Sequence, residues 1–189
     1  MAASTSSRGR PPASSREVLA DAAGDLFLEQ GYEATSIAEI ARRAGVSRSS
    51  FFNYFTNKAE ILWFVFDRRV EVLEAALGDA GIPLTEALPA FAVGAPPDLL
   101  ALAIVDARTM GVEDELAAGR AARQQRIAGA IADRLERDGE DRIRAEIRAA
   151  AYAGALVSAV WRWADLGAGR HALDEVVAET LDAARAVLR

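Results

Sequence analysis

The chain of 189 residues contains no cysteine, so neither a structural disulfide nor a cysteine-ligated metal site is open to it. His171 is its single histidine, which excludes a histidine cluster, and we expect no Ser/His/Asp constellation around it. No apolar run approaches the roughly 18 residues that a membrane span needs. Residues 1–14 also lack the apolar stretch of a secretory signal. We therefore expect a cytoplasmic protein that is not an enzyme, uses no cofactor or metal, and has no membrane partner.

Basic charge is scarce overall, since the net charge is −6, but it is unevenly placed. Residues 1–58 have a net charge of +1 and the remainder −7, so a local basic patch near the N-terminus is compatible with the acidic total. Lys58 is the only lysine, and Asn53 and Asn57 are the only asparagines, all within six positions. We take this clustering only as a hint that the segment has a special requirement.

The pattern of helix starts and stops predicts an all-α protein. Gly31 and Gly45 stand where two helices should end in a left-handed cap, and no stretch alternates as a strand does. Three helix starts fit the capping box, and they are Ser14 with Glu17, Ser36 with Glu39, and Asn57 with Glu60. About nine helices are predicted, at 15–30, 36–44, 47–55, 57–77, 84–93, 98–110, 113–138, 141–166 and 172–188.

The second and third of these helices are separated only by Gly45, Val46 and Ser47. Two short helices joined by a three- or four-residue turn containing glycine are typical of a helix-turn-helix. We expect Val46 to be the apolar residue that fixes the turn. On the following helix, Phe51, Phe55 and also Phe52 are expected to turn inward, which leaves a small, polar face outward. Such a face suits the major groove of DNA, where side chains reach base edges.

The stretch TSIAEIARRAGVSRSSFFNYFTNKAEIL, residues 35–62, resembles the helix-turn-helix of TetR-family transcriptional regulators. The resemblance extends back through REVLADAAGDLFLEQGYEATS, so it covers residues 16–62, and beyond residue 66 it lies only in the all-helical layout. It implies that Thr35, Tyr54 and Lys58 contact the DNA backbone and that Arg48, Ser49, Ser50 and Asn53 lie in the groove. Position 52 is often tyrosine in that family, and Phe52 lacks its hydroxyl, so we assign this side chain to packing.

The resemblance also implies a division of the chain. We expect a disordered arm at 1–13, a helix-turn-helix DNA-binding domain at 14–58, and a helical ligand-binding and dimerisation domain at 59–189. In the arm, Arg8 and Arg10 belong to an Arg-Gly-Arg-Pro sequence that resembles the core of an AT-hook, which lies in the minor groove. The alternative, which we favour, is an arm that adds only phosphate contacts.

Two groups of residues in the second part, the aromatic residues and the small apolar residues of the last two helices, each have two possible roles. Most aromatics are expected in the core, but some of Trp63, Phe66, Phe91, Met110 and Trp161 could line a pocket for an effector. The last two helices have wide apolar stripes, which either pack within one chain or form a two-fold dimer interface. The interface residues we name are Ile147, Ala151, Gly154, Val177, Leu181 and Ala184.

Two functions remain open from the sequence. The first is a homodimeric transcriptional regulator, a repressor by preference, which binds a double-stranded DNA operator and is released by a small-molecule effector. The second is a helical small-molecule sensor or carrier that acts through protein partners and retains a vestigial helix-turn-helix, which the acidic pI near 5.0 favours. The operator sequence and the effector are not specified by any residue pattern.

Overall fold

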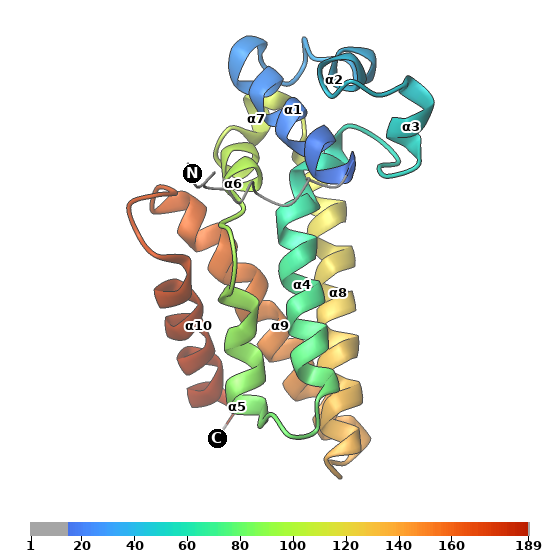
Figure 1. The fold of residues 1–189 in the computed structure, drawn as a ribbon. Coiled ribbons are helices and arrows are strands. Elements are labelled where there is room, and N and C mark those ends of the chain that lie inside the picture. The colour runs from blue at the N-terminus through green and yellow to red at the C-terminus, as the bar shows by residue number, and fades with distance from the viewer. Residues whose placement is uncertain (1–14, 189) are drawn as a thin grey trace, which may run out of the picture. The chain divides into compact units, whose positions relative to one another are not determined.

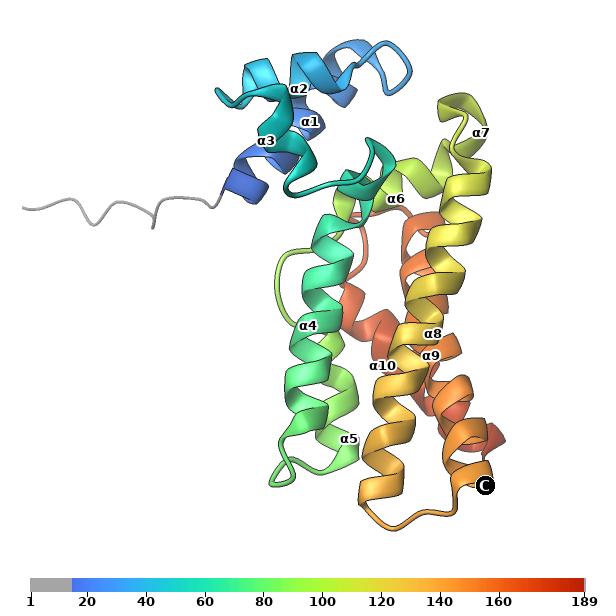
Figure 2. The ribbon, with the colours of Figure 1, turned by 90° about the vertical axis from the view of Figure 1, so that its right-hand side faces the viewer.

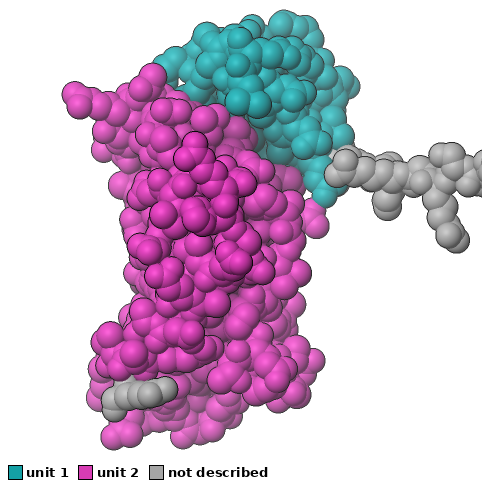
Figure 3. Space-filling model, turned by 90° about the vertical axis from the view of Figure 1, so that its left-hand side faces the viewer, with its two compact units in different colours: residues 1–61 teal, residues 62–189 magenta. Residues whose placement is uncertain are grey.

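The structure is a computed structural model that describes residues 15–188, so the predicted arm with Arg8 and Arg10, and the Ser14 cap, lie outside the described residues. The chain divides into two compact units, residues 1–61 and 62–189 (Figure 3). Within the described part there are ten α-helices and two 3₁₀ helices, where about nine helices were predicted, and no strand was assigned. The all-α prediction is confirmed.

The first unit contains three α-helices. They are α1 (Ser15–Gln30), α2 (Ile37–Arg43) and α3 (Arg48–Phe52) (Figure 1). Leu19 and Ala23 of α1 are fully buried, as is Ile40 of α2, because apolar residues recur at helical spacing on their inner faces. The predicted capping box at Ser36 and Glu39 is present, and Gly31 and Gly45 have the positive φ that a left-handed helix end requires.

The second unit is built around four longer helices. The elements from the unit boundary onward are η1 (Ala59–Trp63), α4 (Phe64–Gly78), α5 (Leu84–Ala87), η2 (Leu88–Ala92), α6 (Asp98–Val105), α7 (Ala107–Met110), α8 (Glu113–Arg137), α9 (Arg142–Asp165) and α10 (Leu173–Val187). Helix α9 packs between α8 and α10, while α4 lies along α8 (Figures 1 and 2). No described helix combines the length and apolar character needed to cross a bilayer.

Three predicted helices are broken where a local residue interrupts them. The helix expected from Asn57 begins as the 3₁₀ helix η1 and becomes α-helical only at Phe64. Pro89 lies at the start of η2 and lacks an N–H, so α5 cannot continue through the predicted 84–93 segment. Asp106 leaves helical geometry, with φ −105° and ψ 21°, and separates α6 from α7.

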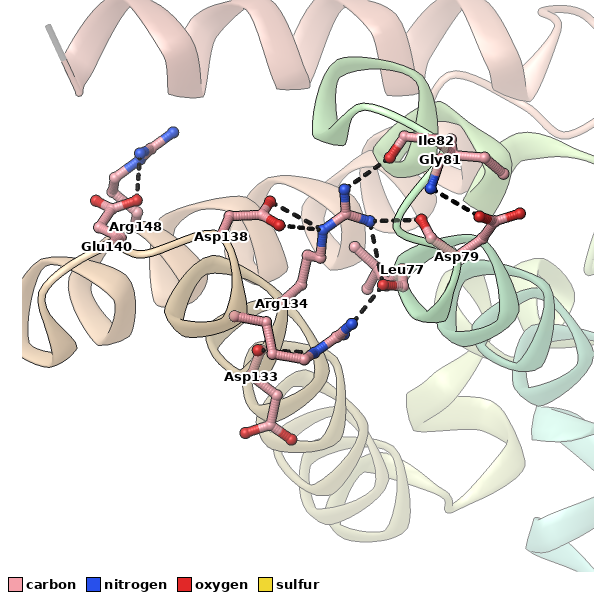
Figure 4. A network of polar contacts seen from close by, with 10 residues as sticks. Leu77, Asp79, Gly81, Ile82, Asp133, Arg134, Asp138, Glu140 and Arg148 are labelled. Carbon is pink, nitrogen blue, oxygen red and sulfur yellow. Dashed lines mark hydrogen bonds and ion pairs between the residues drawn. The ribbon is translucent and has the colours of Figure 1, made fainter.

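Arginines of α8 attach this helix to α4. Arg123 makes a two-pronged ion pair with Asp67 at 2.7 Å on each side, and Arg126 pairs in the same way with Glu74. Further along, buried Arg134 donates to the carbonyls of Leu77, Asp79 and Ile82 and to the carboxylate of Asp138 (Figure 4). Arg134 therefore holds the loop after α4, and together with Arg137 it holds the C-terminal end of α4.

Candidate nucleic-acid interface

The turn between α2 and α3 is short and closed by its own hydrogen bonds. Gly45 has φ 69°, and the Val46 N–H donates to the Ala41 carbonyl at 3.0 Å. Ser47 then caps α3, since its hydroxyl accepts from the Ser50 N–H at 3.1 Å. The predicted turn is present, and it ends at a helix start that has a side-chain cap.

Helix α3 separates its aromatic and polar residues as the sequence predicted at most positions. Phe51 is fully buried and Phe55 is 3% exposed, with their ring centroids 5.7 Å apart. Arg48, Ser49 and Asn53 are exposed on the other side. The helix thereby anchors itself with rings and presents a short polar surface.

Serine hydroxyls form a small cluster at the start of α3. The Ser47 hydroxyl lies 2.8 Å from the hydroxyls of both Ser49 and Ser50. Because a hydroxyl can donate and accept, this cluster can exchange its internal bonds for bonds to a base edge or a phosphate. Ser49 is the more accessible of the two predicted groove residues, because Ser50 is half-buried.

The prediction for Phe52 was wrong. Its side chain is 49% exposed and stands edge-on to Phe51, with Arg48 over its ring at 6.0 Å. The inner side of this segment is occupied by Phe51 of α3 and by Phe55, which follows the helix end at Phe52. Phe52 therefore lies beside the exposed polar residues and shapes the position of the Arg48 guanidinium.

The side chains of Thr35 and Lys58 bind groups of their own unit, whereas the family resemblance implied that they contact the DNA backbone. Thr35 is 2% exposed, and its hydroxyl donates to the Gly31 carbonyl at 2.7 Å. The Lys58 ammonium donates to the carbonyls of Tyr32 (2.6 Å) and Thr35 (3.1 Å) and lies 3.9 Å from the Tyr32 ring centroid. Partial burial lowers the pKa of Lys58. Both side chains hold the loop that precedes α2.

Two other residues of this unit present polar groups outward. Tyr54 is 40% exposed, so its side chain is accessible to the DNA backbone that it is predicted to contact. Arg42, which sequence reasoning missed, has a side chain that is 76% exposed and only a long 4.0 Å ion pair with Glu39. The signal was available, since Arg42 and Arg43 stand together in the last turn of α2, but Arg43 is occupied by Glu29.

The aromatics named for an effector pocket are mostly core residues. Trp63, Phe66 and Phe91 are 2% exposed or less and form a chain of rings, with centroids 5.5 Å and 5.4 Å apart, and Met110 is 8% exposed. Trp161 alone among the five lines an open groove of about 400 Å³. We call this the α8 groove, and it is lined by Ile104, Ala107, Glu113, Leu116, Ala117, Arg120, Ala121, Gln124 and Trp161.

The residues named for a dimer interface fall into two groups. Ile147 is 60% exposed, and Ala151, Gly154 and Ala184 are half-buried, so these four present surface. Val177 and Leu181 are each 1% exposed because they face the core of their own unit, so neither offers surface to a second copy. Ile143, one helical turn before Ile147, is 68% exposed and was not named.

Comparison with known proteins identifies the first unit. Residues 19–62 match the family described as "Bacterial regulatory proteins, tetR family". The match covers the helix-turn-helix of the first unit and ends at the start of the second unit. Over 65 residues it is 38% identical to the HTH-type transcriptional repressor ComR of Escherichia coli K12 and 37% identical to the HTH-type transcriptional activator FasR of Mycolicibacterium smegmatis.

These TetR-family matches cover part of each protein. The aligned segment is 34% of this chain and 31% of ComR, so the chain spans about a third of the length of the curated relatives it matches. Among solved structures, the TetR-family repressor FadR of Thermus thermophilus, in complex with lauroyl-CoA, aligns over 90% of this chain and 93% of its own. The two share 25% identity with a TM-score of 0.57.

Proposed function

We propose that this protein is a sequence-specific DNA-binding transcriptional regulator that acts as a homodimer. The observation that carries the proposal is the exposed polar face of α3, with Arg48, Ser49 and Asn53 opposite buried rings, directly after a closed turn. An arginine can read guanine and an asparagine can read adenine in the major groove. An intact reading face disfavours the alternative of a carrier with a vestigial helix-turn-helix.

Backbone contacts in this proposal come from Tyr54 and Arg42, while Thr35 and Lys58 shape the loop that positions α2. Phosphate contacts supply affinity and base contacts supply specificity. We assign repression by preference because ComR and the Thermus FadR are both repressors, although FasR is an activator. A two-fold DNA reader needs two half-sites about 34–36 Å apart or a multiple of that spacing, which is why a dimer is proposed. The interface of this dimer would use the exposed residues of α9.

We also propose that a small-molecule effector controls DNA binding through the second unit. FadR of Thermus thermophilus is a TetR-family protein with a bound acyl-CoA, which supports ligand control here as a general arrangement. An effector can shift the balance only by its different affinities for the two conformations. The location in the cell, which we expect to be the cytoplasm, stays a prediction.

Selection of bound duplexes from random DNA, followed by titration of the selected duplex, tests the proposal. Arg48→Ala should relax the sequence preference at one position in each half-site, costing about 1–3 kcal/mol there. Arg42→Ala should weaken binding to all duplexes alike and lower the slope of log K against log salt by about one. Arg43→Ala is the control, because its guanidinium is held by Glu29. Recovery of no enriched sequence by the wild type would refute the proposal.

A further inference from the structure

Arg120 differs from the other arginines of α8 in what it contacts. Arg123, Arg126 and Arg134 each hold a carboxylate, and Arg137 donates to the carbonyls of Leu77 and Asp133. Among the described residues, Arg120 makes one long hydrogen bond, to the Ser158 hydroxyl at 3.4 Å, and has no acidic partner. Arg120 is half-buried, so its guanidinium is partly withdrawn from water without a carboxylate to balance its charge.

The Arg120 guanidinium is held over the face of Trp161, with 4.4 Å between its central carbon and the ring centroid. Stacking of this kind uses the face of the guanidinium and leaves its N–H groups pointing outward in the plane. A planar fork with open donors matches a carboxylate in two-pronged geometry. The side chain is therefore already oriented before any ligand arrives.

The rest of the α8 groove surrounds this fork with apolar surface and one further polar group. Ile104, Leu116 and Trp161 supply the apolar walls. Gln124, one helical turn beyond Arg120 on the same face of α8, has no hydrogen-bond partner among the described side chains and can add an amide N–H. The groove of about 400 Å³ is in the range of small-molecule sites.

Glu113 limits the charge of the occupant. It lines the groove seven residues before Arg120, which places it about 10 Å away along α8. A second anionic group at that end of a ligand would meet this carboxylate. The groove thus favours one anionic group near Arg120 and an apolar body that extends toward Leu116.

A second hollow of this unit offers no open arginine donor. It measures about 590 Å³, and its arginine, Arg69, is 2% exposed. Arg69 already donates to the carbonyls of Phe91, Gly94 and Ala95. Its guanidinium is consumed in closing a loop, so it is not available to an anion there.

We propose that the α8 groove binds a small monocarboxylate, with Arg120 and Gln124 holding the carboxylate and Ile104, Leu116 and Trp161 covering the apolar body. This assigns a chemical class to the effector and so rests on the proposed regulatory function. Binding would also change the surroundings of Trp161, whose ring centroid is 5.9 Å from that of Trp63.

Calorimetric titration of the full chain with matched pairs of compounds tests the assignment. The acids are octanoate, 3-phenylpropanoate and benzoate, and each has its primary amide as the neutral partner of equal shape. At least one acid should bind at least tenfold more tightly than its amide, with a change in tryptophan fluorescence. If no acid exceeds its amide, the proposal is overturned, and so it is if octanoyl-CoA binds while the free acids do not.

Substitutions on α8 test whether the acid binds in this groove. Arg120→Gln should weaken the binding of the preferred acid about ten- to a hundredfold, since a hydrogen bond to a charged group is lost, and Gln124→Leu should weaken it less. Arg126→Gln is the matched control on α8, because Arg126 pairs with Glu74 and does not line the groove. Equal affinity of wild type and Arg120→Gln would contradict the site.

A separate titration with the selected DNA duplex distinguishes the two proposals. Acid binding without any DNA preference would refute the regulatory function and leave the groove assignment intact. DNA binding without acid binding would refute the groove assignment alone. If both hold, Arg120→Gln should bind the duplex as the wild type does but should no longer be released by the acid.

Discussion

The two units differ in the range of the contacts that hold their polar residues. In residues 15–61, the bonds that cap α2 and α3 join side chains no more than three positions apart, as Ser36 with Glu39 and Ser47 with Ser50 do. In residues 62–188, the arginines of α8 reach partners more than 50 positions earlier, as Arg123 does with Asp67. The helix caps of the first unit are therefore set by local sequence signals, although Arg43 and Lys58 of that unit reach more distant partners, and α8 of the second unit depends on side chains that meet only after folding.

The largest expected effect comes from Arg134, the most buried of these long-range donors. Arg134→Met should destabilise the second unit by about 2 kcal/mol or more, because the Ile82 carbonyl loses its charged donor and the Leu77 and Asp79 carbonyls each keep only one other donor. Tryptophan fluorescence in urea measures this, since Trp63, Trp161 and Trp163 all belong to that unit. Arg142→Met removes an exposed pair with Glu146 and should leave the stability of the unit nearly unchanged. If the two variants lost equal free energy of unfolding, burial would not distinguish the contribution of Arg134 from that of Arg142.

A smaller effect is expected where α8 passes Trp63. A Cβ on Gly119 would lie 2.7 Å from three atoms of the Trp63 indole, which is itself buried and flanked by Phe66. Gly119→Ala should therefore cost about 1–2 kcal/mol despite its better helix propensity. Gly129 lies on the same helix with no atom near its would-be Cβ, so Gly129→Ala should stabilise by about 0.5–1 kcal/mol. The same urea titration compares them, and a stabilising Gly119→Ala would show that the indole moves aside freely.

In the first unit, loss of a local cap should have a moderate and confined effect. Ser36→Ala should cost about 1 kcal/mol, because the Glu39 N–H loses its acceptor and the Glu39 carboxylate loses the hydroxyl. Faster amide hydrogen exchange in α1–α3, with α8 and α9 unchanged, is the expected readout. Ser49→Ala is the control, since Ser49 does not cap a helix, and its exchange pattern should match the wild type. Uniform loss of protection in both units would argue against independent local organisation.

The smallest effect is a dependence on pH in the same cap. The backbone N–H and hydroxyl of Ser36 donate to Glu39 and hold the pKa of its carboxyl below the usual value. Because the folded pKa is below the unfolded one, the cap stabilises fully above the ordinary pKa of glutamate and weakens as pH falls through the lowered value. Exchange protection of wild type and Glu39→Gln should differ at pH 7 and converge in acid. A difference that persists in acid would assign the effect to something other than ionisation.

Sequence patterns predicted the first unit closely because its signals are local. The Ser36 capping box, the positive φ at Gly31 and Gly45, and the inward rings of Phe51 and Phe55 all depend on neighbours within a few positions. Phe52 was wrongly predicted to turn inward, because Phe51 and Phe55 already occupy the buried side of this segment. The contacts of Lys58 within its own unit could not be predicted, because its partners, the carbonyls of Tyr32 and Thr35, lie more than 20 positions away.

In the second unit, the helices were predictable and their partners were not. Wide apolar stripes predicted α9 and α10, but only packing decided that Val177 and Leu181 face inward while Ile143 and Ile147 stay exposed. Aromatic content predicted a pocket somewhere, but packing made Trp63, Phe66 and Phe91 into core and left Trp161 beside the α8 groove.

By itself the sequence determined the helical fold, the turn before α3 and the likeness of the first unit to the TetR family, because capping, glycine geometry and apolar spacing act over one or two helical turns. Only the tertiary structure decided which arginines of α8 pair with a carboxylate. Arg123 and Arg120 are three residues apart on one helix, yet the first meets Asp67 and the second meets the face of Trp161. That choice depends on which helix lies against each side of α8, which no local pattern specifies.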